Sequence, residues 1–148
     1  MSFFATRPDA VAYLKGGADT PKVHGTVRFF QGQTGVWVVA KVSNLPKENK
    51  TGFFGFHIHE GNSCGGDSFA ETGGHYSPSP SAHPMHAGDL PPLLSVNGQA
   101  YLAVQTDRFR VEEILGRTVV IHGSADDFTS QPAGNAGIKI ACGVIRRP

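Results

Sequence analysis

The sequence predicts an all-β fold in which short strands are joined by turns. Short apolar runs alternate with turn residues from one end of the chain to the other. Glycine and proline are plentiful, at 19 and 10 residues, and no long amphipathic helical pattern appears. Because glycine and proline favour turns and interrupt helices, this combination indicates many short strands rather than a helical bundle.

The predicted strands are apolar segments bounded by turn residues. They span residues 10–15, 23–30, 35–42, 53–59, 99–105, 117–122 and 137–144, and a further strand is possible around 93–96. Residues 111–115 alone have a helical pattern, and this length allows at most a turn or two. Residues 65–92, rich in Gly, Ser, Pro and His, show little periodicity. A loop of that length is usually functional or disordered, and the histidines in and beside it favour function.

Length and charge restrict the classes of protein to consider. We expect the 148 residues, 1–148, to form one domain large enough to bury a core. Charged residues make up 17% and the formal net charge is +1, so no nucleic-acid partner and no anionic-membrane patch is implied. No apolar run approaches membrane-spanning length. The first residues lack the basic start and apolar stretch of a secretory signal, which predicts a cytoplasmic protein, unless a signal was removed from an exported one.

The chain contains two cysteines, Cys64 and Cys142. Two separate buried thiols are the default expectation for a cytosolic protein. If the two are joined, the bridge closes a long loop and stabilises the fold by about 4 kcal/mol in the chain-entropy model. Their spacing does not decide between these alternatives.

Histidine is concentrated in a pattern that indicates metal binding. Histidine is the commonest metal ligand, and only His24 lies outside the pattern. Alternate residues of a strand face the same side, so His57 and His59 should project together while their apolar neighbours enter the core. Seen alone, such a pair is more often two exposed polar residues. The other members are His75, His83, His86 and His122.

His83, His86 and Asp89 are three candidate ligands three residues apart in one loop. Two nitrogen donors and one carboxylate suit Zn²⁺, whereas a solvated polar loop has no need of histidine at each step. His75 could complete this set, could join His57 and His59, or could do both as an imidazolate that binds one cation through each nitrogen. In the last case His122, at the end of a strand, would complete a four-histidine copper-type site.

Asp126 lies four residues beyond His122. It is a candidate acceptor for the outward N–H of a metal-bound histidine. An Asx turn at Asp126 and Asp127 is about equally consistent with the sequence.

Six motifs, in order along the chain, resemble those of the copper–zinc superoxide dismutase family. The resemblance runs from about residue 23 to residue 145, nearly the whole chain. The motifs are GFHIHE at 55–60, GHYSP at 74–78, HAGDL at 86–90, GRTVVIH at 116–122, GNAG at 134–137 and ACGVI at 141–145.

The resemblance implies an eight-stranded antiparallel Greek-key β-barrel with long metal-binding loops. It implies superoxide as the substrate, converted to dioxygen and hydrogen peroxide by a redox-cycling copper, with His75 moving a proton. It also implies that Cys64 and Cys142 form a disulfide and that Asp126 links a copper-ligand histidine to a zinc-ligand histidine. The implied ligands are His57, His59, His75 and His122 for copper, and His75, His83, His86 and Asp89 for zinc.

Two departures from the family pattern bear on catalysis. Lys139 stands where the family usually has an arginine that draws the anion to copper, and lysine lacks the planar fork of arginine. The segment 126–135 is also short. We therefore expect an active enzyme whose catalysis is less strongly steered by charge. The alternatives are a non-catalytic copper- and zinc-binding module on the same fold, and a structural barrel with vestigial sites. A homodimer is possible, but no diagnostic interface pattern is visible.

Overall fold

One half of the molecule is a four-stranded antiparallel layer. The computed structural model describes residues 6–148. In it β1 (Ala10–Gly16), β2 (His24–Gln31), β3 (Val36–Ser43) and β7 (Ala100–Thr106) pair in that order. Alternate side chains of β3 belong to the core, and between them Lys41 is exposed and Trp37 and Ser43 are partly exposed, whereas Val39 is buried. This alternation is the period-2 signature of a sheet with one wet face.

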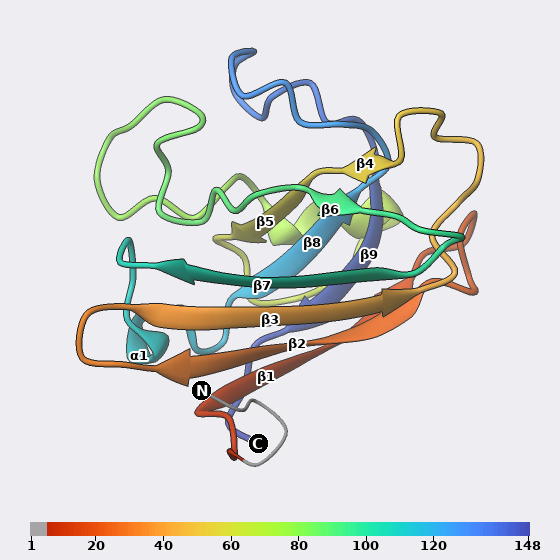
Figure 1. Ribbon diagram of the computed structural model, residues 1–148. Coiled ribbons are helices and arrows are strands. Elements are labelled where there is room, and N and C mark those ends of the chain that lie inside the picture. The colour runs from red at the N-terminus through yellow and green to blue at the C-terminus, as the bar shows by residue number, and fades with distance from the viewer. Residues whose placement is uncertain (1–5) are drawn as a thin grey trace.

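The other half continues the same sheet through β9 (Lys139–Val144), β8 (Thr118–His122) and β5 (Phe56–His59). β9 joins the two halves by pairing with β1 on one edge and β8 on the other. A separate two-stranded piece, β4 (Phe53–Phe54) with β6 (Leu93–Leu94), lies beside the start of β5 (Figure 1).

The connections give the fold its Greek-key character. Residues 44–52 lead from β3 to β4, and residues 107–117 lead from β7 to β8, and neither pair of strands is adjacent in the sheets. Connections of this kind define Greek-key topology. If β4 and β5 are counted as one interrupted strand, the described residues form eight strands, and the predicted all-β antiparallel Greek-key fold is confirmed.

Each predicted strand is present, with bounds shifted by one or two residues. The strand predicted at 53–59 is divided at Gly55, where a Cβ atom would lie 2.7 Å from the Cβ of Ala136. Helix α1 (Val111–Ile114) lies where a short helix was expected. The prediction missed the 3₁₀ segment η1 (Asp67–Thr72) inside the long loop; Ser68 and Phe69 within it have positive φ, so it carries no helical periodicity.

β5 and β8 are buried on both faces, unlike the four-stranded layer. Their inner side chains, among them Phe56, Ile58 and Ile121, belong to the core. The loops that follow β5 and β8 lie together on the side away from β1 and β2 (Figure 1) and cover the outer face. This arrangement places polar side chains of the outer face in a buried compartment between strands and loops.

Candidate metal centre

Three histidines project into this compartment from strands. His57 and His59 alternate along β5 with the core residues Phe56 and Ile58, as the strand period predicts. They are not exposed polar residues, because only 0% and 2% of their surface is accessible. His122, at the end of β8, is also buried, and its N–H donates to the carbonyl oxygen of Gly55 at 2.8 Å.

His75 reaches the same compartment from the long loop. The loop runs along the free edge of β5, where the main chain of His75 forms an isolated antiparallel β-bridge with that of His59. The N–H of Tyr76 donates to the carbonyl oxygen of Ile58 at 2.8 Å. The donor atoms of the four rings all lie within 4.8 Å of one another, so the four could hold one metal ion. We call this set the strand group: His57, His59, His75 and His122.

Each of the three strand-borne rings is anchored through its other nitrogen. Nδ1 of His59 donates to the carbonyl oxygen of Gly73 at 2.8 Å, and Nδ1 of His122 donates to that of Gly137 at 3.1 Å. Nε2 of His57 donates to Oδ2 of Asp126 at 2.7 Å. Hydrogen bonds of this kind fix the tautomer and orientation of metal-binding histidines.

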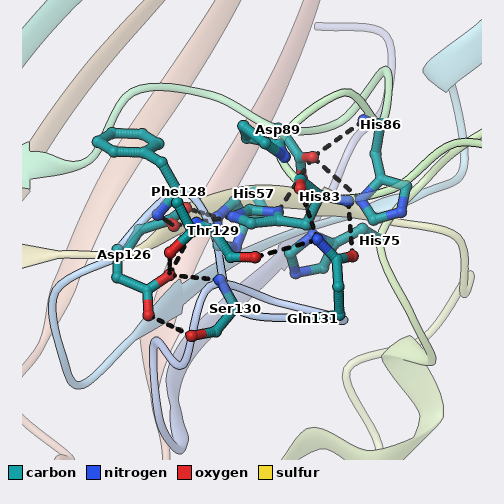
Figure 2. Close-up of polar contacts among 12 residues, drawn as sticks. His57, His75, His83, His86, Asp89, Asp126, Phe128, Thr129, Ser130 and Gln131 are labelled. Atoms are coloured by element: carbon teal, nitrogen blue, oxygen red, sulfur yellow. Dashed lines mark hydrogen bonds and ion pairs between the residues drawn. The ribbon is translucent and has the colours of Figure 1, made fainter.

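A second set of donors lies beside the first and includes His75. Nδ1 of His75 lies 2.7 Å from Oδ1 of Asp89, while Nδ1 of His83 and Nδ1 of His86 lie 3.1 and 3.0 Å from its Oδ2 (Figure 2). We call this set the loop group: His75, His83, His86 and Asp89. Its ring nitrogens converge on one carboxylate, as the three-residue spacing in the sequence suggested.

The grouping by mutual distance differs from the predicted loop group in one member. Donor atoms of His57, His75, His83 and Asp89 also lie within 4.8 Å of one another, and His86 is not in that set. Nε2 of His57 is, however, occupied by Asp126. The one remaining ring nitrogen of His57, Nδ1, belongs to the strand group, whereas Nδ1 of His86 lies 3.0 Å from Asp89, so His86 is the fourth member of the loop group.

Asp126 connects the two groups. Its Oδ2 accepts from Nε2 of His57, and its Oδ1 accepts from Nε2 of His83 at 2.8 Å. Oδ1 also accepts from the N–H of Phe128, so this residue forms the Asx turn as well as the histidine contacts. Hydrogen bonds from both histidines and from Phe128 outweigh burial and hold the pKa of Asp126 below its usual range.

Several buried ring nitrogens have no hydrogen-bond partner, which tests whether the groups suit metal ions. An unpartnered buried polar atom is costly, and in native proteins it usually marks a function or a bound ion. Two such nitrogens face the strand group, and two face the loop group, where they approach Oδ2 of Asp89 at 3.1 and 3.0 Å without forming a hydrogen bond. Within residues 6–148 they are Nδ1 of His57, Nε2 of His75, Nδ1 of His83 and Nδ1 of His86. The donor sets, four imidazoles and three imidazoles with one carboxylate, therefore fit copper- and zinc-type ions.

Burial keeps the strand-borne imidazoles neutral. It lowers the pKa of His59 to about 2 and the pKa of His122 to about 3, with repulsion from neighbouring histidines and Lys139 acting in the same direction. Burial also lowers the pKa of His57, despite the opposing effect of Asp126. Metal ligation requires the neutral imidazole, so these rings are ready to bind near neutral pH.

Lys139 lies at the edge of the strand group, opposite His122 in the β8–β9 ladder. Its ammonium group donates to Oγ1 of Thr72 at 2.7 Å and to the carbonyl oxygen of Gly73 at 3.2 Å. Gly73 thus accepts from both His59 and Lys139. The cation is therefore held in one place beside the histidines, and burial lowers its pKa.

A disulfide joins Cys64 to Cys142, with an S–S distance of 2.01 Å. The alternative of two separate thiols does not hold in this structure. The bond ties the loop after β5 to β9, three residues beyond Lys139. The seventh histidine, His24, is exposed at the start of β2, where Nδ1 donates to the carbonyl oxygen of Lys22.

Apart from Asp126, sequence patterns did not reveal the groups that support the ligands. Two are main-chain carbonyls, those of Gly73 and Gly137, and backbone atoms carry no sequence signal. Two more are side chains that contact the main chain of the loop group, Arg108 and Gln131. Neither occurs at a spacing related to the histidines.

Over residues 6–148, no helix has the length and apolarity needed to cross a membrane.

The fold and the site together define a metalloprotein with two adjoining histidine-rich groups on an antiparallel Greek-key barrel. Residues 23–145 match the family model described as copper/zinc superoxide dismutase (SODC), and the chain belongs to this family. A copper–zinc superoxide dismutase of Deinococcus radiodurans is 36% identical, covering 86% of this chain and 79% of the relative. That of Legionella pneumophila is 32% identical, covering 99% and 92%. The crystal structure of a double mutant of a SOD-like protein from Bacillus subtilis matches with a TM-score of 0.76 and 28% identity, covering 90% and 95%.

Proposed function

We propose that this protein is an enzyme that converts two superoxide ions and two protons into dioxygen and hydrogen peroxide. The observation that carries the proposal is the sharing of His75 between two adjoining donor groups. Unpartnered ring nitrogens point into both groups, as binding of two ions requires. Family membership supports the same reaction.

We assign the strand group to copper and the loop group to zinc. Four imidazoles suit copper, and an oxygen donor in place of the fourth imidazole suits zinc. Copper supplies the one-electron chemistry when it is bound. In this assignment His57 would hold copper through the nitrogen that Asp126 leaves free, and His59 and His122 through the nitrogens that the carbonyl oxygens of Gly73 and Gly137 leave free. His75 would contribute to both ions. His83, His86 and Asp89 complete the zinc set.

The chain's own groups bring in the anion and supply a proton. The cation of Lys139, fixed by Thr72 and Gly73, attracts superoxide to the edge of the strand group. Nε2 of His75 has no hydrogen-bond partner in the chain, so whenever it does not hold the metal it can hold a proton for the departing peroxide. Asp126 accepts hydrogen bonds from His57 and His83 and so fixes the position of the strand group relative to the loop group.

The direct test measures superoxide removal by protein loaded with both metals, for the native chain and for His122→Ala. We expect the native protein to exceed free-metal controls by several orders of magnitude and the variant to lose most of that activity. Metal analysis should give one copper and one zinc per chain, with zinc retained in His122→Ala. Native activity equal to that of free metal would leave a non-catalytic binding module. Full activity in His122→Ala would refute the copper assignment.

Three further predictions concern the whole protein rather than the site. We propose that residues 1–148 act as one domain of this family and that the protein works in the cytoplasm, or outside it if a signal was removed. Homodimer formation also stays a prediction. Fractionation with the gene at its native locus tests the compartment, and sedimentation equilibrium tests the oligomeric state.

A further inference from the structure

The main chain of the loop group is held on one side by a glutamine from a different loop. Oε1 of Gln131 accepts from the N–H of His83 at 2.9 Å, and Nε2 of Gln131 donates to the carbonyl oxygen of His83 at 2.7 Å. The carboxamide thus satisfies both main-chain groups of one residue, as a neighbouring strand would. Figure 2 shows Gln131 beside His83, next to the converging rings.

Gln131 itself is held by a rigid turn. Oδ1 of Asp127 accepts from the N–H groups of Thr129 and Ser130 at 2.9 and 2.8 Å. The N–H of Gly134 donates to the carbonyl oxygen of Ser130 at 2.7 Å, which closes the segment. A side chain on such a closed segment can position its partner, because the segment itself has little freedom left.

Arg108 holds the segment that carries His83 and His86, at the positions that follow His83. Nη1 of Arg108 donates to the carbonyl oxygen of Pro84 at 2.7 Å and to that of His86 at 3.2 Å. Arg108 follows β7, so this contact ties the loop group to the four-stranded layer. Two side chains from two separate parts of the fold therefore hold residues 83–86, which carry two of the loop-group rings.

From these contacts we infer that Gln131 and Arg108 are positioning residues that set the affinity of the loop group for its metal. The inference rests on the proposed function, because it takes zinc as that metal. Neither side chain is among the four donors. They act through the main chain of residues 83–86, whose fixed path brings Nδ1 of His83 and of His86 within 3.1 and 3.0 Å of Oδ2 of Asp89. We call the hydrogen bonds of each of these two side chains a clamp. Without either clamp the main chain of residues 83–86 gains conformational freedom, and metal binding must then order it at a cost in affinity.

The test measures Zn²⁺ affinity of the metal-free protein by competition with a chromophoric chelator. Gln131→Met keeps the length of the side chain and removes both hydrogen bonds, and Arg108→Met removes the other clamp. Gln33→Met is the matched control, because Gln33 is exposed in the turn between β2 and β3, away from the site. Partners outside the donor set typically change metal affinity by about 10- to 100-fold. We expect about tenfold weaker binding for Gln131→Met, a smaller loss for Arg108→Met and no change for the control.

Two further measurements separate positioning from general stability. The visible spectrum of Co²⁺ bound in place of Zn²⁺ reports the ligand geometry, and we expect it to change in Gln131→Met. The thermal midpoint of the metal-free variant should fall no more than that of the Gln33→Met control. Affinity and spectrum unchanged in both clamp variants and in their combination would overturn the inference. So would equal losses of zinc and copper affinity together with a lower thermal midpoint. Failure of the native protein to bind Zn²⁺ would instead overturn the proposed function.

Discussion

The two metal-binding groups differ in what holds their members in place. The strand group takes His57, His59 and His122 from β5 and β8, whose ladder hydrogen bonds fix the backbone. The loop group takes His83 from an irregular segment, whose backbone is fixed instead by Gln131 and Arg108. Strand ligands are therefore positioned by the fold itself, and loop ligands by individual side chains from distant parts of the chain.

This contrast indicates that the two groups should fail in different ways. Damage to a single side chain should disturb the loop group first, since each clamp is a pair of hydrogen bonds. The strand group should keep its geometry unless the loops that follow β5 and β8 detach from the outer face of these strands. Asp126 and His75 are the points at which a disturbance passes from one group to the other.

The largest expected effect comes from the double substitution Cys64→Ser and Cys142→Ser, which removes the disulfide that ties the loop after β5 to β9. The disulfide spans a sequence separation of 78 residues, and its removal should cost about 4 kcal/mol of unfolding free energy. Chemical denaturation under non-reducing conditions measures this loss. Because Gly73 lies on the released loop, the strand group should weaken too. An unchanged unfolding free energy would show that packing alone holds this loop in place.

A smaller effect is expected where the loop group meets Asp126. Gly134 has φ +69°, and a Cβ there would lie 2.0 Å from Oδ1 of Asp126 and 2.6 Å from Nε2 of His83. Gly134→Ala should destabilise the protein by about 3 kcal/mol, from left-handed backbone strain plus the clash, and should lower zinc affinity.

Gly116 supplies the matched control for that prediction. It has φ +84° but open space within 4 Å of an added Cβ. Gly116→Ala should therefore cost only the strain of about 1–2 kcal/mol and leave zinc affinity unchanged. Thermal unfolding and chelator competition measure both quantities. Equal effects of the two substitutions would mean that the loop moves aside without affecting the donors.

The metal-free strand group should make stability depend on pH. The pKa values of His59 and His122, lowered by burial to about 2 and about 3, lie below the unfolded value of 6.5. Between these values the unfolded chain binds more protons, so stability rises with pH. The contribution is complete above about pH 6.5 and is lost as the pH falls toward the folded values. Each histidine contributes a slope of about 1.4 kcal/mol per pH unit in that window.

Urea unfolding of the metal-free protein between about pH 7 and about pH 5 measures this slope. His122→Gln should reduce the slope by about 1.4 kcal/mol per pH unit, the contribution of one proton, because glutamine does not titrate. A slope unchanged by this substitution would show that His122 is accessible to protons in the folded state. Binding of both metals to the native chain should make the slope steeper, because all the ligand histidines then stay deprotonated in the folded state while the unfolded chain still binds protons.

The smallest expected effect concerns Lys139. Lys139→Ala should lower kcat/KM for superoxide by about tenfold at low ionic strength, and salt should shrink the difference. Lys41→Ala removes the same charge from an exposed position of β3, away from the site, and should have little effect. Stopped-flow assays over a range of ionic strength measure both. A native rate near the diffusion limit with steep salt dependence would contradict the expected weak steering.

Local patterns in the sequence were sufficient to predict the strands and the pairs of ligands. Alternation placed His57 and His59 on one face, and the three-residue spacing of His83, His86 and Asp89 brought their donors together. Both arguments involve neighbours in the chain, whose relative positions follow from backbone geometry alone. Local patterns left two alternatives open for Asp126 and three for His75, because both roles depend on which segments meet in space, and only the family resemblance implied one role for each.

The sequence by itself determined the fold class, the donor types and their local spacing, since these follow from periodicity and side-chain chemistry. Only the tertiary structure decided that the outer face of β5 is buried and that Gln131 and Arg108 hold the loop group. It also confirmed the pairing of Cys64 with Cys142, which the family resemblance implied and the spacing left open. These contacts join residues that lie 22 to 78 positions apart in the chain. The packing of loops over strands brings them together, and no local pattern specifies it.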